Sequence, residues 1–297
     1  MSSGPARLTA ATLGVLALAV APSLADARTK PAAATVSVDV AAIQAAMDEQ
    51  RFQDAGRMID GATLAGARDP ILGLLAGELR LARGQYDDAL KIFKDLPEKP
   101  ALKARLMCDR GLALSLIGKS DEAFAALKQA VILDDSQWRA WNALGGEYDR
   151  RQDWANAEDA YAHALTASNR DAIVLNNRGF SRVLQNRLDD GIADLVAALQ
   201  KKPDLSAART NLRLAMGLKG DYDRALAAGP QEDKAALYNN VGYAAMLRGD
   251  QARATELFNK ALTERSEFYG RASNNLDLAG AMKPDAPAKP GPVNAKP

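Results

Sequence analysis

The sequence predicts an all-α fold, a solenoid of about seven helix-turn-helix repeats closed by one further helix. The main observation is a period, because a small residue recurs every 34 residues, at Ala55, Ala89, Ala123, Ala157, Gly191 and Ala225. Such a fixed period is typical of stacked two-helix units. Composition agrees, since 47% of the residues are hydrophobic but only 5% are aromatic, which suits helices packed closely through small side chains.

The unit that starts at Trp138 shows the pattern most clearly. Counted from 1 at Trp138, its apolar or small signature residues are Trp141, Leu144, Gly145, Tyr148, Trp154, Ala157, Tyr161 and Ala164. Positions 4, 7, 8 and 11 fall on one face of a first helix. Positions 8 and 20 hold Gly145 and Ala157. We expect both positions to be small because the two helices of the unit cross closely there.

The same register places the other units in order along the chain. They begin at Val36, Pro70, Ala104, Ala172, Ser206 and Ala235. The unit from Ser206 is shortened by Gly229-Pro230, so the next step is 29 residues and reaches Ala254. After residue 268 the chain reads as one more first helix without a partner. We therefore expect the repeat domain, with this cap, to span residues 38–282.

At nearly every signature position, the unit from Trp138 resembles the tetratricopeptide repeat (TPR) family. The resemblance implies a right-handed superhelix that binds a protein or an extended peptide in its concave groove. It also implies that positions 2, 5, 6, 9, 12 and 13 of each first helix line that groove. The paired Lys and Arg of chaperone-binding TPR domains are absent, since positions 5 and 9 of the unit from Pro70 hold Leu74 and Glu78.

Asparagine recurs at two of these groove positions. Position 5 holds Asn142, Asn176 and Asn239, and position 6 holds Asn177, Asn211, Asn240 and Asn274. A carboxamide both donates and accepts hydrogen bonds, so such a ladder can pair with a peptide backbone of any sequence. The alternative is that these amides only bond within or between repeats. Beside them, the groove positions that could contact a peptide's side chains hold Arg139, Arg150, Phe180 and Tyr243.

The sequence offers no residues for catalysis, a metal or a cofactor. Cys108 and His163 are the only cysteine and the only histidine. We expect Cys108 to pack between helices, a reactive or dimer-forming thiol being the alternative, and a single His makes no metal site. The net charge of +1 argues against nucleic acid as a partner. We therefore expect a protein that is not an enzyme.

The two ends differ from the repeats. Arg7 precedes a short apolar run with small residues near 25–27, which is typical of a cleaved secretory signal peptide over residues 1–27, an uncleaved anchor being the alternative. Residues 28–37 read as a linker, and the Pro-, Ala- and Lys-rich residues 283–297 as a disordered tail, a spacer or a weak docking segment. These features predict a periplasmic protein with no membrane span in its mature chain.

The C-terminal half also resembles the TadD-type proteins of Tad/Flp pilus assembly. The matching segments are ARTNLRLAMGLKGDYDRA from Ala208, NNVGYAAMLRGD from Asn239 and SNNLDLA near the end. The resemblance implies a non-enzymatic scaffold that helps to assemble the pilus or secretion machinery, although the lipid-bearing Cys usual in that family is missing here. An adaptor for cell-wall or division enzymes is the alternative. The identity of the partner and the oligomeric state stay open.

Overall fold

The computed structural model describes residues 38–228, 233–264 and 270–281, and over these ranges the chain forms helices and no strands. The helices are α1 (Val40–Asp48), α2 (Phe52–Leu64), α3 (Pro70–Ala82), α4 (Tyr86–Asp95), α5 (Pro100–Leu116), α6 (Ser120–Leu133), α7 (Trp138–Arg150), α8 (Trp154–Ala167), α9 (Ala172–Leu184), α10 (Leu188–Lys201), α11 (Ser206–Lys219), α12 (Tyr222–Ala227), α13 (Lys234–Leu247), α14 (Gln251–Thr263) and α15 (Gly270–Ala281). They form seven successive pairs and one unpaired last helix, which confirms the predicted fold class. The expected signal peptide, linker and tail lie outside the described residues.

Each first helix ends at a residue with left-handed backbone. Position 15 has a positive φ in all seven units, at Gln50, Gly84, Gly118, Gln152, Asn186, Gly220 and Gly249. A residue of this conformation closes a helix and reverses the chain, and glycine adopts it without steric cost. The sharp turn between the helices of a unit is therefore encoded at one repeated position.

In most units the two helices touch through a glycine on the first helix. In five units the glycine at position 8 packs against the residue at position 24, in the pairs Gly77–Phe93, Gly111–Leu127, Gly145–Tyr161, Gly179–Leu195 and Gly242–Phe258. A Cβ on Gly145 would lie 2.6 Å from two ring carbons of Tyr161. The alanine at position 20 is fully buried, as at Ala157. The prediction that positions 8 and 20 must be small is confirmed in these five units, whereas the units from Val36 and Ser206 hold Ile43 and Arg213 at position 8.

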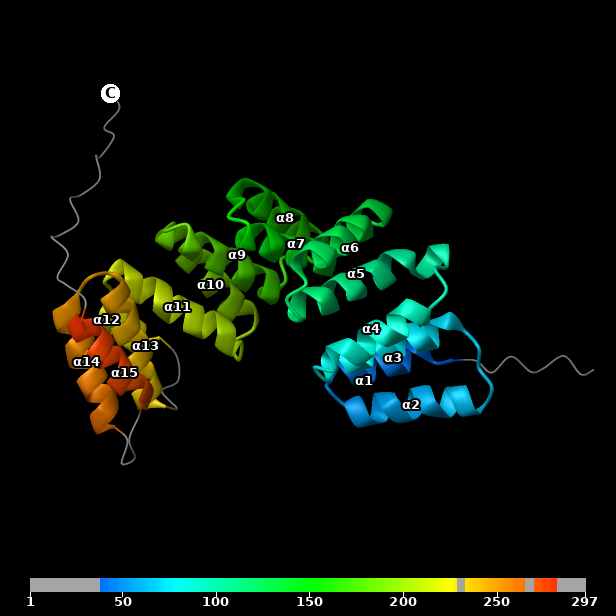
Figure 1. Cartoon of the computed structure of the whole chain (residues 1–297), viewed down its shortest axis with the longest axis horizontal. Coiled ribbons are helices and arrows are strands. Elements are labelled where there is room, and N and C mark those ends of the chain that lie inside the picture. Colours follow the sequence, from blue (N-terminus) through cyan, green and yellow to red (C-terminus); the bar gives the residue numbers. More distant parts are fainter. Residues whose placement is uncertain (1–37, 229–232, 265–269, 282–297) are drawn as a thin grey trace, which may run out of the picture.

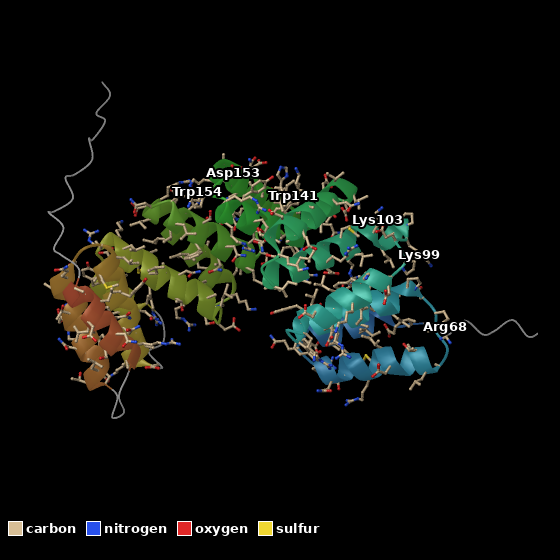
Figure 2. The ribbon with its side chains drawn as sticks, viewed as in Figure 1. Arg68, Lys99, Lys103, Trp141, Asp153 and Trp154 are labelled. Atoms are coloured by element: carbon tan, nitrogen blue, oxygen red, sulfur yellow. The ribbon has the colours of Figure 1, made fainter. Side chains whose placement is uncertain are left out.

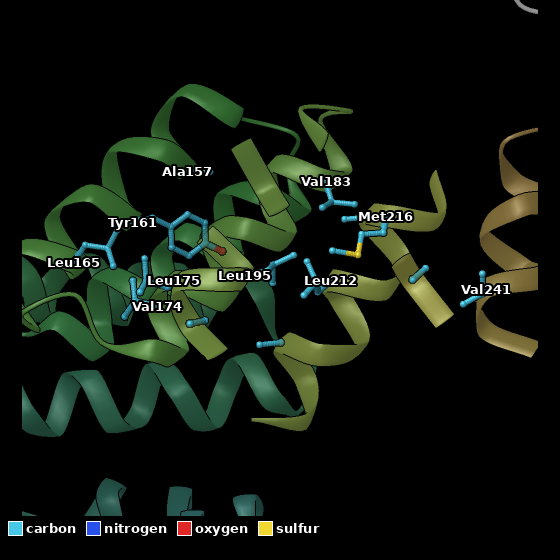
Figure 3. Packing of buried hydrophobic residues seen from close by; sticks show 14 of the residues in the cluster. Ala157, Tyr161, Leu165, Val174, Leu175, Val183, Leu195, Leu212, Met216 and Val241 are labelled. Carbon is cyan, nitrogen blue, oxygen red and sulfur yellow. The ribbon is translucent and has the colours of Figure 1, made fainter. Parts of the chain in front are cut away.

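The buried side chains join one unit to the next. The largest cluster runs from Ala157 and Tyr161 on α8, through Leu195 on α10 and Leu212 on α11, to Val241 on α13. Figure 3 shows these side chains bridging successive helices. Because no unit encloses a core of its own, each unit depends on its neighbours for burial.

Three helix starts differ from the sequence expectation. Helix α1 begins at Val40 and not at Val36, and α13 begins at Lys234, one residue before Ala235. Helix α5 begins at Pro100 and not at Ala104, because proline at the first helical position needs no hydrogen bond from its nitrogen. Helix α12 has only six residues, as the shortened unit predicted.

The odd-numbered helices form the inner layer of the solenoid. From α1 to α15, each odd-numbered helix contacts the next odd-numbered one, whereas no described pair of consecutive even-numbered helices is in comparable contact. Elements on the inside of a curve lie closer together than those on the outside. Figure 1 shows the units following an arch from α1 to α15.

Among the described residues, no helix has the length and apolar character needed to cross a bilayer.

Candidate functional site

The inner layer carries two neighbouring hollows. One, of about 400 Å³, lies between α5, α7, α8 and α9, and its walls include Arg150, Phe180 and Leu184. The other, of about 530 Å³, lies against α1, α3, α5, α7 and α9, and its walls include Trp138 and Arg139. Asn142 lines both hollows, so they adjoin one another on the concave side, and we call the two together the groove.

The structure brings together several of the residues that the sequence selected. Asn142, Asn177, Arg150 and Phe180 line the smaller hollow, while Arg139 and Asn142 line the larger one. These side chains come from helices α7 and α9, where positions 2, 5, 6, 9 and 13 of the repeat fall on the inner face. These side chains therefore line the hollows, and their contact with a peptide stays a prediction.

The asparagines bond to one another between repeats. The side-chain amide of Asn177 donates to Asn142 Oδ1 at 3.1 Å, and that of Asn211 donates to Asn176 Oδ1 at 3.0 Å. Asn176 in turn donates to Asn177 Oδ1 at 2.9 Å, which joins three successive first helices in one chain of amides. Much of the hydrogen-bonding capacity is thus used inside the protein. Asn142 ends this chain only as an acceptor, so its amide group can donate into the groove.

A second group of amides joins the last helices. Asn275 on α15 donates to Asn239 Oδ1 at 2.9 Å, and Asn239 donates to Asn240 Oδ1 at 3.3 Å. Asn275, and not Asn274, therefore takes the inter-repeat place in the cap. Asn274 and Asn240 are exposed, as is Tyr243.

Buried charges beneath the larger hollow are the feature that sequence reasoning missed. Arg105 on α5 donates hydrogen bonds to both carboxylate oxygens of Glu78 on α3, at 2.5 and 2.6 Å, and a further one to Gln44 on α1. Asp109 is fully buried beside them and accepts from Arg139 at 3.3 Å. The available signal was the run of charged residues at groove positions 2, 6 and 9 in successive units.

Burial controls the ionisation of Asp109. Removal from water, followed by the charge of Glu78, raises the pKa of Asp109 well above its usual value. Its Oδ2 atom has no hydrogen-bond partner among the described residues. Arg139, which donates to Asp109, also lines the larger hollow, where its guanidinium can meet a carboxylate of a bound peptide.

Arg150 at the groove edge is held by a network around Glu147. The fully buried Glu147 accepts from Ser115 at 2.7 Å and from Arg150 at 2.7 Å, and it also accepts from Ser120 and Arg151. Burial acts to raise the pKa of Glu147, but these hydrogen bonds and positive charges outweigh burial and lower it. Arg150 therefore joins α7 to α5 as well as facing the hollow.

The single cysteine and the single histidine both pack against other side chains. Cys108 is 1% exposed, and burial raises the pKa of its thiol to about 12. His163 stacks on Trp141, with ring centroids 4.5 Å apart; Figure 2 labels Trp141 on α7. No cluster of metal-ligating side chains occurs within the described ranges.

Comparison with known proteins identifies the architecture. No family model matches the chain. A tetratricopeptide repeat protein from Parabacteroides merdae superposes with a TM-score of 0.50 at 16% identity, covering 81% of this chain and 97% of that chain. A chain of the APC/C hetero-tetramer Cut9–Hcn1 superposes with a TM-score of 0.58 at 14% identity, covering 80% of this chain and 48% of that chain. The fold is a TPR superhelix.

One curated protein gives a partial sequence match. Human Protein O-mannosyl-transferase TMTC1 is 24% identical over 150 residues, which are 49% of this chain and 17% of that protein. This chain thus matches less than a fifth of the transferase.

Proposed function

We propose that this protein is a non-catalytic scaffold that binds an extended segment of a partner protein in the groove between α1 and α9. The observation that carries the proposal is the pair of adjoining hollows on the inner layer, with Asn142 in both. The Cut9–Hcn1 hetero-tetramer provides a precedent for a protein of this fold in a protein assembly.

The groove offers what an extended peptide requires. Trp138, Leu112, Phe180 and Leu184 provide apolar walls for side chains. The Asn142 amide provides a donor for a backbone carbonyl, at the point where the two hollows meet. A segment that alternates apolar side chains with exposed backbone groups fits this surface best.

Substitution within the groove tests this proposal. The variant Asn142→Ala with Phe180→Ala removes an amide and an aromatic ring from the hollows, whereas Gln200→Ala alters an exposed residue of the outer helix α10. Partners captured from envelope extract by the full chain should be lost with the groove variant and kept with Gln200→Ala. Equal capture by both variants, at equal melting temperatures, would overturn the groove as the binding site.

We further propose that the protein acts in the periplasm, in assembly of a Tad/Flp-type pilus or its secretion machinery. The apolar N-terminal run and the resemblance of the segments from Ala208 and Asn239 support this location and role. N-terminal sequencing of the periplasmic protein should find a chain that begins near Asp26 or Arg28. An intact Met1 on cytosolic protein would refute export, and normal pili in a deletion strain would refute the role in pilus assembly.

A further inference from the structure

An apolar row runs along the inner layer at position 13 of the C-terminal first helices. Leu184 on α9 and Leu247 on α13 are each 52% exposed, and Leu218 on α11, between them, is half-buried. We call Leu184, Leu218 and Leu247 the leucine row. Leu184 lines the smaller hollow, which places the start of the row at the groove edge. The preceding unit holds Arg150 at this position, so the row ends there.

The spacing of the row is set by helix packing. Helix α9 contacts α11, and α11 contacts α13. The axes of packed helices lie about 8–10 Å apart. A segment that covers the row must therefore present an apolar group about every 9 Å.

The sequence after α15 has this spacing. Pro284, Pro287 and Pro290 follow one another at every third residue, and Val293 continues the series. A polyproline II helix has three residues per turn and rises about 3.1 Å per residue, so residues three apart share one face at intervals of about 9.3 Å. Proline favours this conformation, so little conformational entropy is lost on docking.

The last described helix ends close to the end of the row. Because Asn275 bonds to Asn239 as position 6 of the cap, the last described residue, Ala281, takes position 12. Helix α15 therefore ends one residue short of position 13, and it contacts the helix that carries Leu247. Three unit steps from the cap to Leu184 span about 24–30 Å. Three turns of polyproline II, from Pro284 to Val293, span about 28 Å.

We propose that residues 284–293 dock on the leucine row of the same chain as a polyproline II segment. Pro287 then covers Leu247, Pro290 covers Leu218, and Val293 covers Leu184. The segment shields these leucines from water and occupies one edge of the groove. This interaction is intramolecular and needs no partner, so its test is independent of the test of the proposed function.

Cysteine crosslinking in the full chain tests the register. The native Cys108 is buried, and its pKa of about 12 leaves it unreactive, so it contributes no background. The test pair is Leu184→Cys with Val293→Cys. The matched control is Gln200→Cys with Val293→Cys, which uses an exposed residue of the outer helix in the same unit. Rates of disulfide formation are measured on dilute protein, and the linked peptides are identified by mass spectrometry.

The test pair should form an intramolecular disulfide roughly ten-fold faster than the control. This ratio of rates corresponds to a docking free energy of about 1.4 kcal/mol. The pair Leu247→Cys with Pro287→Cys should form its disulfide as readily, because both contacts belong to one register. Equal rates for the test pair and the control would overturn the proposal. Disulfides between two chains would also overturn it, since they would mean that the row receives a second copy.

Discussion

Replacing Gly145 by alanine gives a direct measure of how tightly the two helices of a unit cross. A Cβ at Gly145 would lie 2.6 Å from two ring carbons of Tyr161, whereas a Cβ at the adjacent Gly146 would meet nothing closer than 3.9 Å. The Tyr161 ring cannot move away easily, because it is 2% exposed and its hydroxyl donates to Asp149 at 2.8 Å. Gly146→Ala is therefore a matched control on the same helix.

Two effects of opposite sign determine the change in the free energy of unfolding. Alanine stabilises a helix interior by about 0.8–1.0 kcal/mol relative to glycine, and both variants gain this. Overpacking costs about 1–3 kcal/mol and affects only Gly145→Ala. The variants should therefore differ by about 1–3 kcal/mol, with Gly146→Ala the more stable. For a chain of this size, that difference corresponds to roughly 2–12 °C in Tm.

Urea and thermal unfolding followed by far-UV circular dichroism measure this difference on the full chain. Because stability in a solenoid is spread over neighbouring units, both variants must be followed with the same probe under the same conditions. Equal stability of the two variants would refute the close crossing of α7 and α8.

Three further predictions concern other parts of the solenoid. Ala157→Leu forces a large side chain into a fully buried position and should lower the free energy of unfolding by about 1–3 kcal/mol in a denaturant titration. Replacing Asn177, Asn211 and Asn240 together by alanine removes four hydrogen bonds, two of them between repeats, each contributing about 0.5–1.5 kcal/mol. A melting temperature equal to that of the wild type would contradict a structural role for these amides. Burial and Glu78 raise the pKa of Asp109, so its contribution to stability is complete below the unfolded pKa of about 3.9 and is lost as pH rises through the folded pKa. Asp109→Asn should accordingly gain stability relative to the wild type as pH rises above about 4, by up to about 1.4 kcal/mol per pH unit until the folded pKa is reached. A stability difference between the two proteins that stays the same at every pH would exclude this effect.

The sequence by itself determined the architecture, because its signals are local and repeated. The small residues at positions 8 and 20, such as Gly145 and Ala157, fix where the helices of a unit cross. Each signal concerns residues that meet within one unit, and their periodic repetition makes the pattern visible without a structure.

Only the tertiary structure decided which polar side chains meet between units. Asn177 reaches Asn142 across 35 residues, and Arg105 reaches Gln44 across 61. Such contacts depend on how far each unit is rotated and shifted against the next, which the packing of many side chains sets together. The burial of Asp109, and the one-residue shift that puts Asn275 in place of Asn274, follow from that packing and not from any local pattern.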